Sequence, residues 1–115
     1  MLTGLPRHLS PLETAAIAEF VAAARALLGA DLHEIRLFGS RARGEGDEES
    51  DVDLAFIVTT AGRARRREIY DLAYDIGLRT GIDLAPMLIE RDRLATLRAR
   101  ERLFAAELDR DGVVL

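Results

Sequence analysis

The amino-acid sequence predicts a single small α/β domain, of the α+β kind, in which a mixed β-sheet is flanked by helices. One observation is the change of apolar periodicity along the chain, which gives the order helix, strand, strand, helix, strand, helix. A second is length, because 115 residues are enough to bury most of the apolar surface of one domain. A third is the lack of any internal repeat, low-complexity tract or linker. We therefore expect one domain over residues 1–115.

The first helix is predicted for residues 11–28, after an irregular lead-in. Ser10 is a good cap, Pro11 suits the first helical position, and Glu13 completes a capping box. Gly29 supplies the stop. The apolar residues at helical spacing are Leu12, Ala16, Phe20, Ala24, Leu27 and Leu28.

The central segment, residues 32–90, begins with two predicted strands. Residues 32–38 form the first, and the second runs over residues 51–58. The second is apolar on both faces beyond its first turn, which is typical of a strand in the middle of a covered sheet. We expect the two strands to form the centre of the domain.

A helix from about 63–79 and a third strand over residues 82–89 complete this segment. The residues of the helix's buried stripe are Ile69, Leu72, Ala73 and Ile76, and we expect Tyr70 and Tyr74 to pack at its boundary. Pro86 has no N–H for a ladder, so the third strand should lie at an edge or be bulged there. Residues 92–110 are predicted to be helical, as one bent helix or two short ones, and residues 113–115 to add a short strand.

Composition and charge exclude several classes of protein. No cysteine is present, so disulfides and thiolate metal sites are excluded, which fits a cytoplasmic protein. No signal-peptide pattern or membrane-length apolar run is found. The net charge of −4 makes free nucleic acid an unfavourable ligand. Every basic residue is Arg. We interpret the run Arg63, Arg65, Arg66 and Arg67 as a solvated helix face, in preference to a contact surface for RNA or protein.

Two carboxylates stand one residue apart at the start of the second strand. Because strand side chains alternate, Asp51 and Asp53 should share a face, with backbones about 6.5–7 Å apart. Carboxylates that close repel each other, and a divalent cation would remove that penalty. The turn Gly39-Ser40 after the first strand could hold phosphate. The residues alone therefore suggest metal-dependent phosphate chemistry.

Three rival motifs fail on single residues. A P-loop needs Lys and Ser or Thr directly after its second glycine, whereas Glu45 and Gly46 follow Gly44. A calcium loop starting at Asp47 or Asp51 lacks the central glycine and final glutamate in the required places. No G-x-G-x-x-G joins a strand to a helix, which excludes the dinucleotide fingerprint.

A Gly-Ser pair, ten residues, and then Asp-x-Asp on a strand is the composite that remains. It resembles the DNA polymerase β-like nucleotidyltransferase superfamily, and most closely its minimal nucleotidyltransferase (MNT) group, whose members carry a G-S-R-A-R-G…S-D-x-D-L signature. The resemblance covers about residues 30–90 and implies the polymerase β-like fold. The matching residues here are Gly39-Ser40-Arg41-Ala42-Arg43-Gly44 and Ser50-Asp51-Val52-Asp53-Leu54.

The resemblance also implies roles for individual carboxylates. Two Mg²⁺ ions about 4 Å apart would stabilise an in-line displacement at the α-phosphate of ATP, the expected substrate. Asp51 and Asp53 would hold both ions. The family's third carboxylate lies on the next strand after one helix, where Asp83 stands, and it would complete the second site and help to deprotonate the attacking hydroxyl. Pro86 departs from the unbroken apolar third strand of the family, so the direction in which the Asp83 side chain points stays open.

Phosphate contacts are expected from the loop after the first strand. Gly39 would let the backbone approach the phosphates, and the Ser40 hydroxyl would bond the β- and γ-oxygens. Arg41 and Arg43 would either contact the triphosphate or pair with the acidic run that follows them.

The resemblance to MNT proteins implies an antitoxin. In pairs of the HEPN–MNT type, the MNT protein transfers AMP from ATP onto a tyrosine of the HEPN ribonuclease and silences it, a protein AMPylation. We expect the acceptor to be brought by such a partner chain, or to lie at an interface within an oligomer. Two alternatives stay open: a small-molecule, aminoglycoside-like nucleotidyltransferase working with a second subunit, and a non-enzymatic antitoxin that binds its partner.

Overall fold

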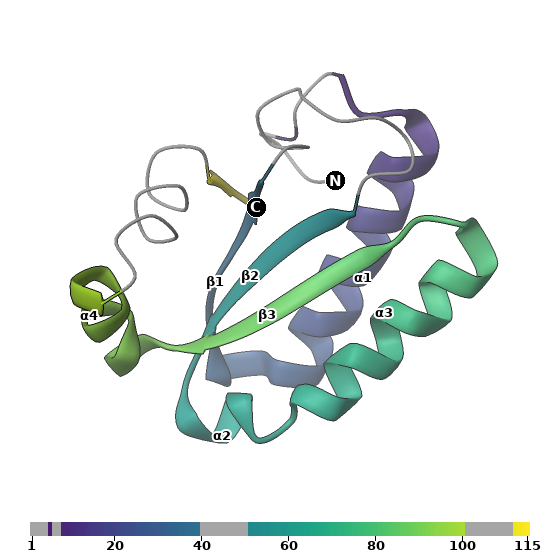
Figure 1. The fold of residues 1–115 in the computed structure, drawn as a ribbon. Coiled ribbons are helices and arrows are strands. Elements are labelled where there is room, and N and C mark those ends of the chain that lie inside the picture. The colour runs from purple at the N-terminus through teal and green to yellow at the C-terminus, as the bar shows by residue number, and fades with distance from the viewer. Residues whose placement is uncertain (1–4, 6–7, 40–50, 101–111) are drawn as a thin grey trace.

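A computed structural model describes residues 5, 8–39, 51–100 and 112–115 (Figure 1). The C-terminal half of the helix expected over residues 92–110 lies outside these ranges. The elements are α1 (Pro11–Leu28), a 3-10 turn (Gly29–Asp31), β1 (Leu32–Phe38), β2 (Val52–Val58), α2 (Thr60–Arg63), α3 (Arg66–Thr80), β3 (Leu84–Glu90), α4 (Arg91–Arg100) and β4 (Val113–Val114). Within the described ranges, no helix combines the length and apolarity that a membrane crossing requires.

The sheet is mixed, as predicted, with the strand order β3-β2-β1-β4. β2 pairs with β3 in parallel and with β1 in antiparallel orientation, and β1 also pairs with β4. The position of β2 between two strands confirms the interpretation of its two apolar faces. β3 lies at the edge, which confirms the first of the two placements offered for Pro86. The register between β2 and β3 runs without a shift from Leu84 to Glu90, so no bulge forms there.

One face of the sheet is covered by α1 and α3, which Figure 1 shows packed side by side behind the strands. Phe20 of α1 and Phe56 of β2 meet edge to face at the centre of this layer, with ring centroids 5.4 Å apart and planes at 65°. The fully buried residues of largest volume are Phe20, Phe56, Ile17, Ile35, Leu37, Leu54, Ile69, Val21, Val52 and Val58. This layer holds the main hydrophobic core.

The opposite face of the sheet carries a smaller apolar cluster. Phe38, Ala55, Ile57 and Ile89 form it, and Leu94 of α4 packs against it. These residues occupy the alternate strand positions to the core residues, as the pleat requires. This face also continues into the acidic residues described below.

The start of α1 confirms the predicted capping box. The Ser10 hydroxyl accepts a hydrogen bond from the Glu13 N–H, and the Glu13 carboxylate accepts one from the Ser10 N–H, each at 3.0 Å. The helix bounds agree with the predicted 11–28. Leu12, one of the apolar residues at helical spacing, is exposed to 51%.

The helix expected from about 63–79 is divided into α2 and α3. The Thr59 hydroxyl accepts a hydrogen bond from the Gly62 N–H at 3.0 Å and donates one to Asp31 at 2.8 Å. Because Thr59 caps the helix in this way, α2 begins at Thr60, before the predicted start at about residue 63. The backbone then leaves the helical region at Arg65. The Arg65 guanidinium donates to the Leu27 carbonyl at the end of α1 and pairs with Glu68. Arg65 therefore joins α3 to the end of α1, while its side chain stays 40% exposed, as the expected solvated face allows.

Candidate functional site

Three of the predicted site residues meet at one end of the sheet. Because β1 runs antiparallel to β2, the end of β1 lies beside the start of β2, and Phe38 pairs with Asp53. Because β3 runs parallel to β2, its start lies on the other side, and Val52 pairs with Leu84. The Val52 N–H donates to the Asp83 carbonyl at 2.8 Å. The backbones of Asp51 and Asp83 are thus neighbours just ahead of the paired strands.

The side chains of Asp51 and Asp53 belong to the face of the sheet opposite the main core. Val52 and Leu54 point into the core, so Asp51 and Asp53 take the alternate positions on the other face. Asp53 is half-buried, and Asp51 and Asp83 are exposed. β2 begins at Val52 and β3 at Leu84, so Asp51 and Asp83 precede the strands in which they were expected. Both are therefore set at the rim of the sheet, where solvent and a ligand can reach them.

Gly39 lies directly against the Asp53 carboxylate. Its backbone has a φ of +77°, in the left-handed region that favours glycine. A Cβ added to it would lie 2.4 Å from Asp53 Oδ2 and 3.3 Å from its Cγ. A side chain at this position would therefore displace the carboxylate. The turn that follows β1 can approach Asp53 this closely because residue 39 is glycine.

The chemistry of the donor set suits a hard divalent cation, because carboxylate oxygens are the ligands that Mg²⁺ prefers. The close approach of Gly39 places the Asp53 carboxylate beside the backbone of the turn, where it could serve as one ligand of such an ion. Within residues 8–39 and 51–100, no three His, Cys, Asp or Glu side chains stand close enough to hold one ion by themselves. Ligand oxygens would have to complete the coordination. Three predicted phosphate-binding residues, Ser40, Arg41 and Arg43, lie outside the described residues.

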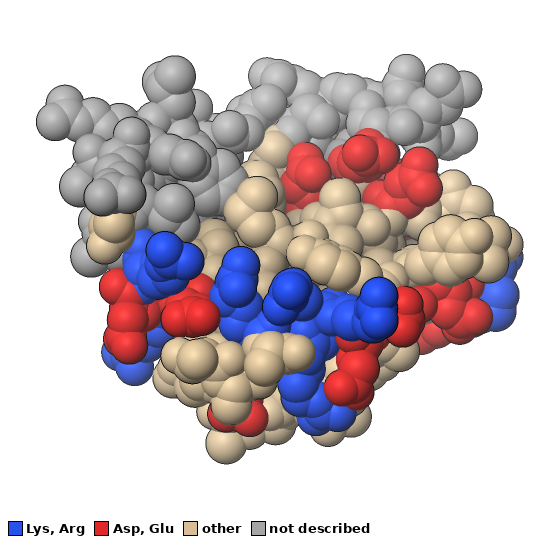
Figure 2. Space-filling model, turned by 60° about the horizontal axis from the view of Figure 1, so that its bottom comes forward, with Lys and Arg blue, Asp and Glu red and all other residues tan. Residues whose placement is uncertain are grey.

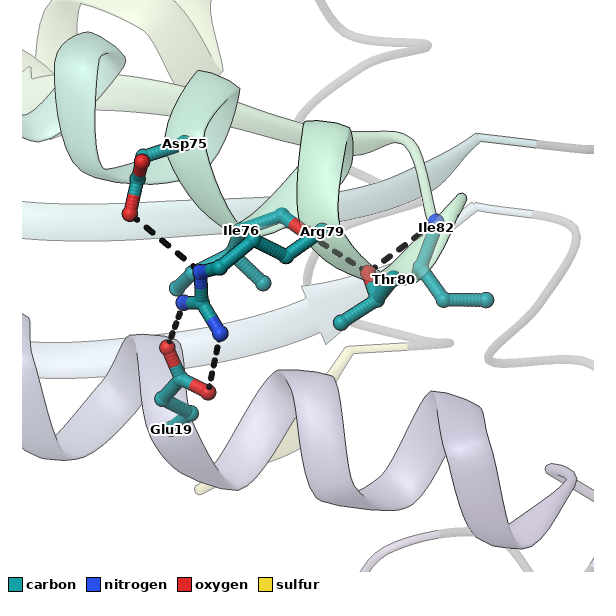
Figure 3. A network of polar contacts seen from close by, with 6 residues as sticks. All are labelled: Glu19, Asp75, Ile76, Arg79, Thr80 and Ile82. Atoms are coloured by element: carbon teal, nitrogen blue, oxygen red, sulfur yellow. Dashed lines mark hydrogen bonds and ion pairs between the residues drawn. The ribbon is translucent and has the colours of Figure 1, made fainter.

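The turn that delivers Asp83 is held by Thr80 (Figure 3). The Thr80 hydroxyl donates to the Ile76 carbonyl at 2.7 Å and accepts the Ile82 N–H at 3.2 Å. Gly81, with a φ of +77°, ends α3 and donates to the Gly77 carbonyl. Ile82, directly before Asp83, is buried in the core. The backbone that leads to Asp83 is therefore held by the Thr80 hydrogen bonds and by the packing of Ile82.

Arg79 joins the same end of α3 to α1, as Figure 3 shows. Its guanidinium pairs with Glu19 across the two helices and with Asp75 at 3.5 Å. The hydrogen bond with Glu19 is the main reason that the pKa of Arg79 is raised above its ordinary value. All three side chains are about half exposed or more, so the pairing adds little stability.

The structure also reveals a groove that sequence reasoning missed. It lies between α3 and the outer edge of β3, has a volume of about 350 Å³, and we name it the α3–β3 groove. Its main lining residues are Tyr70, Tyr74, Leu78, Asp83, Leu84 and Pro86. Tyr70 and Tyr74, expected to pack at the boundary, are exposed to 45% and 69%, so that expectation is wrong. The available signal was their four-residue spacing with Leu78, a second apolar stripe beside the buried one.

Comparison with known proteins agrees with this architecture. A protein of Methanocaldococcus jannaschii named as a protein adenylyltransferase is 37% identical over 75 residues, which cover 63% of this chain and 51% of that one. The chain therefore spans about half the length of this relative.

Two solved structures share the fold. One, a toxin–antitoxin with AMP-PNP, is 22% identical, with a TM-score of 0.50 over 82% of this chain and 68% of that chain. The other, a mutant of the toxin–antitoxin MntA-HpeT, is 22% identical, with a TM-score of 0.52 over 85% of this chain and 70% of that chain.

The family assignment follows from a match that spans most of the chain. The polymerase beta nucleotidyltransferase family matches residues 29–114, from the end of α1 into β4. The matched range contains Gly39, Asp51, Asp53 and Asp83. The chain therefore belongs to the polymerase beta family of nucleotidyltransferases.

Proposed function

We propose that this chain is a Mg²⁺-dependent protein adenylyltransferase that transfers AMP from ATP to a partner toxin. The observation that carries the proposal is the meeting of Asp51, Asp53 and Asp83 at one rim of the sheet in a chain of a nucleotidyltransferase family. The name of the Methanocaldococcus relative supports a protein as acceptor. The toxin–antitoxin structures of the same fold, one of them with AMP-PNP, support ATP as donor and a toxin as partner.

In the proposed reaction a hydroxyl oxygen of the acceptor attacks the α-phosphorus of ATP. The new oxygen–phosphorus bond forms as the bond to the bridging oxygen breaks, and pyrophosphate leaves. Asp83, exposed at the rim, accepts the hydroxyl proton. Asp51 and Asp53 would hold two divalent ions, and Asp83 would complete the second site. These ions, when bound, neutralise the charge that develops on the phosphate oxygens and on the leaving group.

The loop after β1 supplies the phosphate contacts in this proposal. Gly39 brings its backbone beside Asp53, so phosphate oxygens bound there would also reach an ion held by that carboxylate. Ser40, Arg41 and Arg43 follow directly in the chain and keep the roles that the family resemblance implies. For the acceptor, we propose a tyrosine hydroxyl of a HEPN ribonuclease, on the basis of the MNT signature.

A labelling experiment tests the proposal. The purified chain is incubated with Mg²⁺, ATP labelled in its α-phosphate, and the product of the neighbouring gene as the candidate toxin. We expect label on a toxin tyrosine. Asp53→Asn should reduce transfer by more than about 100-fold, because even groups that only orient metal ligands are worth 10–100-fold. Asp71→Asn, an exposed carboxylate on α3, is the matched control and should retain full activity.

Label transfer that survives Asp53→Asn, or no transfer with the wild-type chain, would refute the enzymatic proposal. An Asp53→Asn protein that labels nothing and still neutralises the toxin fully would show neutralisation by binding alone. Pyrophosphate release that depends on a small hydroxylated compound, without a protein, would show a small-molecule acceptor.

A further inference from the structure

The α3–β3 groove is an apolar surface that opens directly beside the candidate site. Tyr70, Tyr74 and Leu78 line its helical side with 45%, 69% and 69% of their surfaces exposed. Asp83 lines its end. Large apolar side chains gathered on one surface commonly mark a place where another molecule binds. A molecule in this groove would therefore bring its own groups to Asp83.

The order of the strands separates this groove from the expected position of the triphosphate. Gly39 follows β1, Asp83 precedes β3, and β2 lies between the two strands. Phosphates bound at Gly39 would thus lie on one side of Asp53, and the groove opens on the other. In an in-line displacement the attacking and leaving groups are on opposite sides of the phosphorus. With the triphosphate at Gly39, the groove would lie on the side from which the acceptor approaches.

The outer edge of β3 is unsuited to pairing with a partner strand. In a parallel ladder, residues alternate between facing the neighbouring strand and facing outward. The Asp83 carbonyl faces β2. The backbone N–H and C=O groups of the alternate positions, 84, 86 and 88, therefore point away from β2, toward the outer edge. Pro86 has no N–H, and it removes the middle donor of this edge. An occupant would therefore bind through side chains, as an amphipathic helix does in an apolar groove.

Arginines at the start of α3 indicate the charge of this occupant. Arg66 and Arg67 are the first two residues of α3, one turn before Tyr70, and both are exposed. Cations at a helix N-terminus oppose the helix dipole. In the described part of the chain, neither forms an ion pair that would offset this cost. Figure 2 shows basic residues in a row on this side of the molecule, with tan surface between them and a group of acidic residues.

We propose that the α3–β3 groove docks an amphipathic helix of the acceptor protein, with acidic residues at the end that meets Arg66 and Arg67. The apolar face of this helix contacts Tyr70, Tyr74 and Leu78, and its docking brings the acceptor hydroxyl to Asp83. The inference rests on the proposed function, since it takes the toxin as acceptor.

Variants of exposed residues test the inference without disturbing the core. Leu78→Asp should raise both the dissociation constant of the toxin complex and the KM for toxin by at least about tenfold, as truncation of an interface hot spot does. Its affinity for Mg²⁺–ATP should be unchanged. Leu12→Asp, a substitution of an equally apolar residue exposed to 51% on α1, is the matched control and should alter neither quantity.

Charge reversal gives an independent test. Arg66→Glu with Arg67→Glu should weaken the toxin complex at low salt, while the thermal midpoint of the chain stays the same or rises, because acidic residues suit the first turn of a helix. A merely structural role of these arginines would instead lower the midpoint.

The failures of the two proposals are distinguishable. A toxin complex that Leu78→Asp weakens, without any label transfer by the wild-type chain, would support the groove and refute the enzymatic function. The docking proposal would be refuted if the KM for toxin stayed within about twofold of the wild-type value in both Leu78→Asp and the double arginine variant. The absence of any toxin complex would refute it as well.

Discussion

Gly39→Ala is the substitution that tests the site geometry most directly. An alanine at a φ of +77° costs about 1–2 kcal/mol, because its Cβ approaches the backbone carbonyl. The Cβ would also lie 2.4 Å from Asp53 Oδ2, where ordinary contacts begin at 3.4 Å. The carboxylate must therefore retreat by about 1 Å, whereas metal–ligand distances tolerate about 0.2 Å. We expect a folded protein whose carboxylate no longer fits a metal–nucleotide complex.

Two measurements separate these effects. Urea denaturation followed by circular dichroism should show a loss of about 1–2 kcal/mol in the free energy of unfolding, which a domain with about 5–15 kcal/mol of stability survives. Calorimetric titration with Mn²⁺ and ATP should show affinity reduced by at least about 100-fold, more than loss of a group that only orients a ligand.

Two other glycines with positive φ provide matched controls. Gly81 has the same φ of +77°, and a Cβ there would meet nothing within 4 Å, so Gly81→Ala should show a similar loss of stability. Gly29→Ala, at the opposite end of the sheet and also without a neighbour within 4 Å, should leave nucleotide affinity unchanged. Nucleotide affinity of Gly39→Ala within about twofold of wild type would refute the assignment of Asp53 as a ligand held against Gly39.

Two more predictions concern side-chain hydrogen bonds. Thr80→Ala leaves the buried Ile82 N–H without its acceptor, so it should lower the free energy of unfolding by about 1–3 kcal/mol and weaken Mn²⁺ binding through Asp83. Thr80→Ser keeps the hydroxyl and should retain both the stability and the Mn²⁺ affinity. Equal effects of the two variants would contradict this role of the hydroxyl. The hydrogen bond from Arg65 lowers the pKa of Glu68 below its ordinary 4.5, so its stabilising effect is present above pH 4.5 and is lost as the pH falls through the lower folded value. The denaturation midpoints of wild type and Glu68→Gln should therefore converge in acid, and a difference that persists at pH 2 would exclude this cause.

Elements defined by neighbouring residues could be predicted from the sequence. The bounds of α1 agree because its cap, first-turn proline and stop lie within a few residues of the ends they determine. The central position of β2 followed from apolar residues on both faces, and the edge position of β3 from Pro86. In each case the information is local, or is a direct consequence of burial.

The boundary between α2 and α3 could not be predicted in this way. Periodicity favoured one helix, but Thr59 binds Asp31, and Arg65 binds the Leu27 carbonyl. The two contacts join residues 28 and 38 positions apart, and residue spacing within one helix contains no trace of them. The exposed stripe of Tyr70 and Tyr74 was misjudged for the same reason, because exposure depends on what packs against a helix face.

By itself, the sequence determined the order of the elements and the resemblance of the Gly-Ser and Asp-x-Asp composite to a nucleotidyltransferase, since motif and periodicity are properties of consecutive residues. Only the tertiary structure decided that Asp83 stands beside Asp51, that Gly39 lies against Asp53, and that a groove opens at Asp83. These relations depend on strand register and on the packing of α3, which join residues distant in the chain.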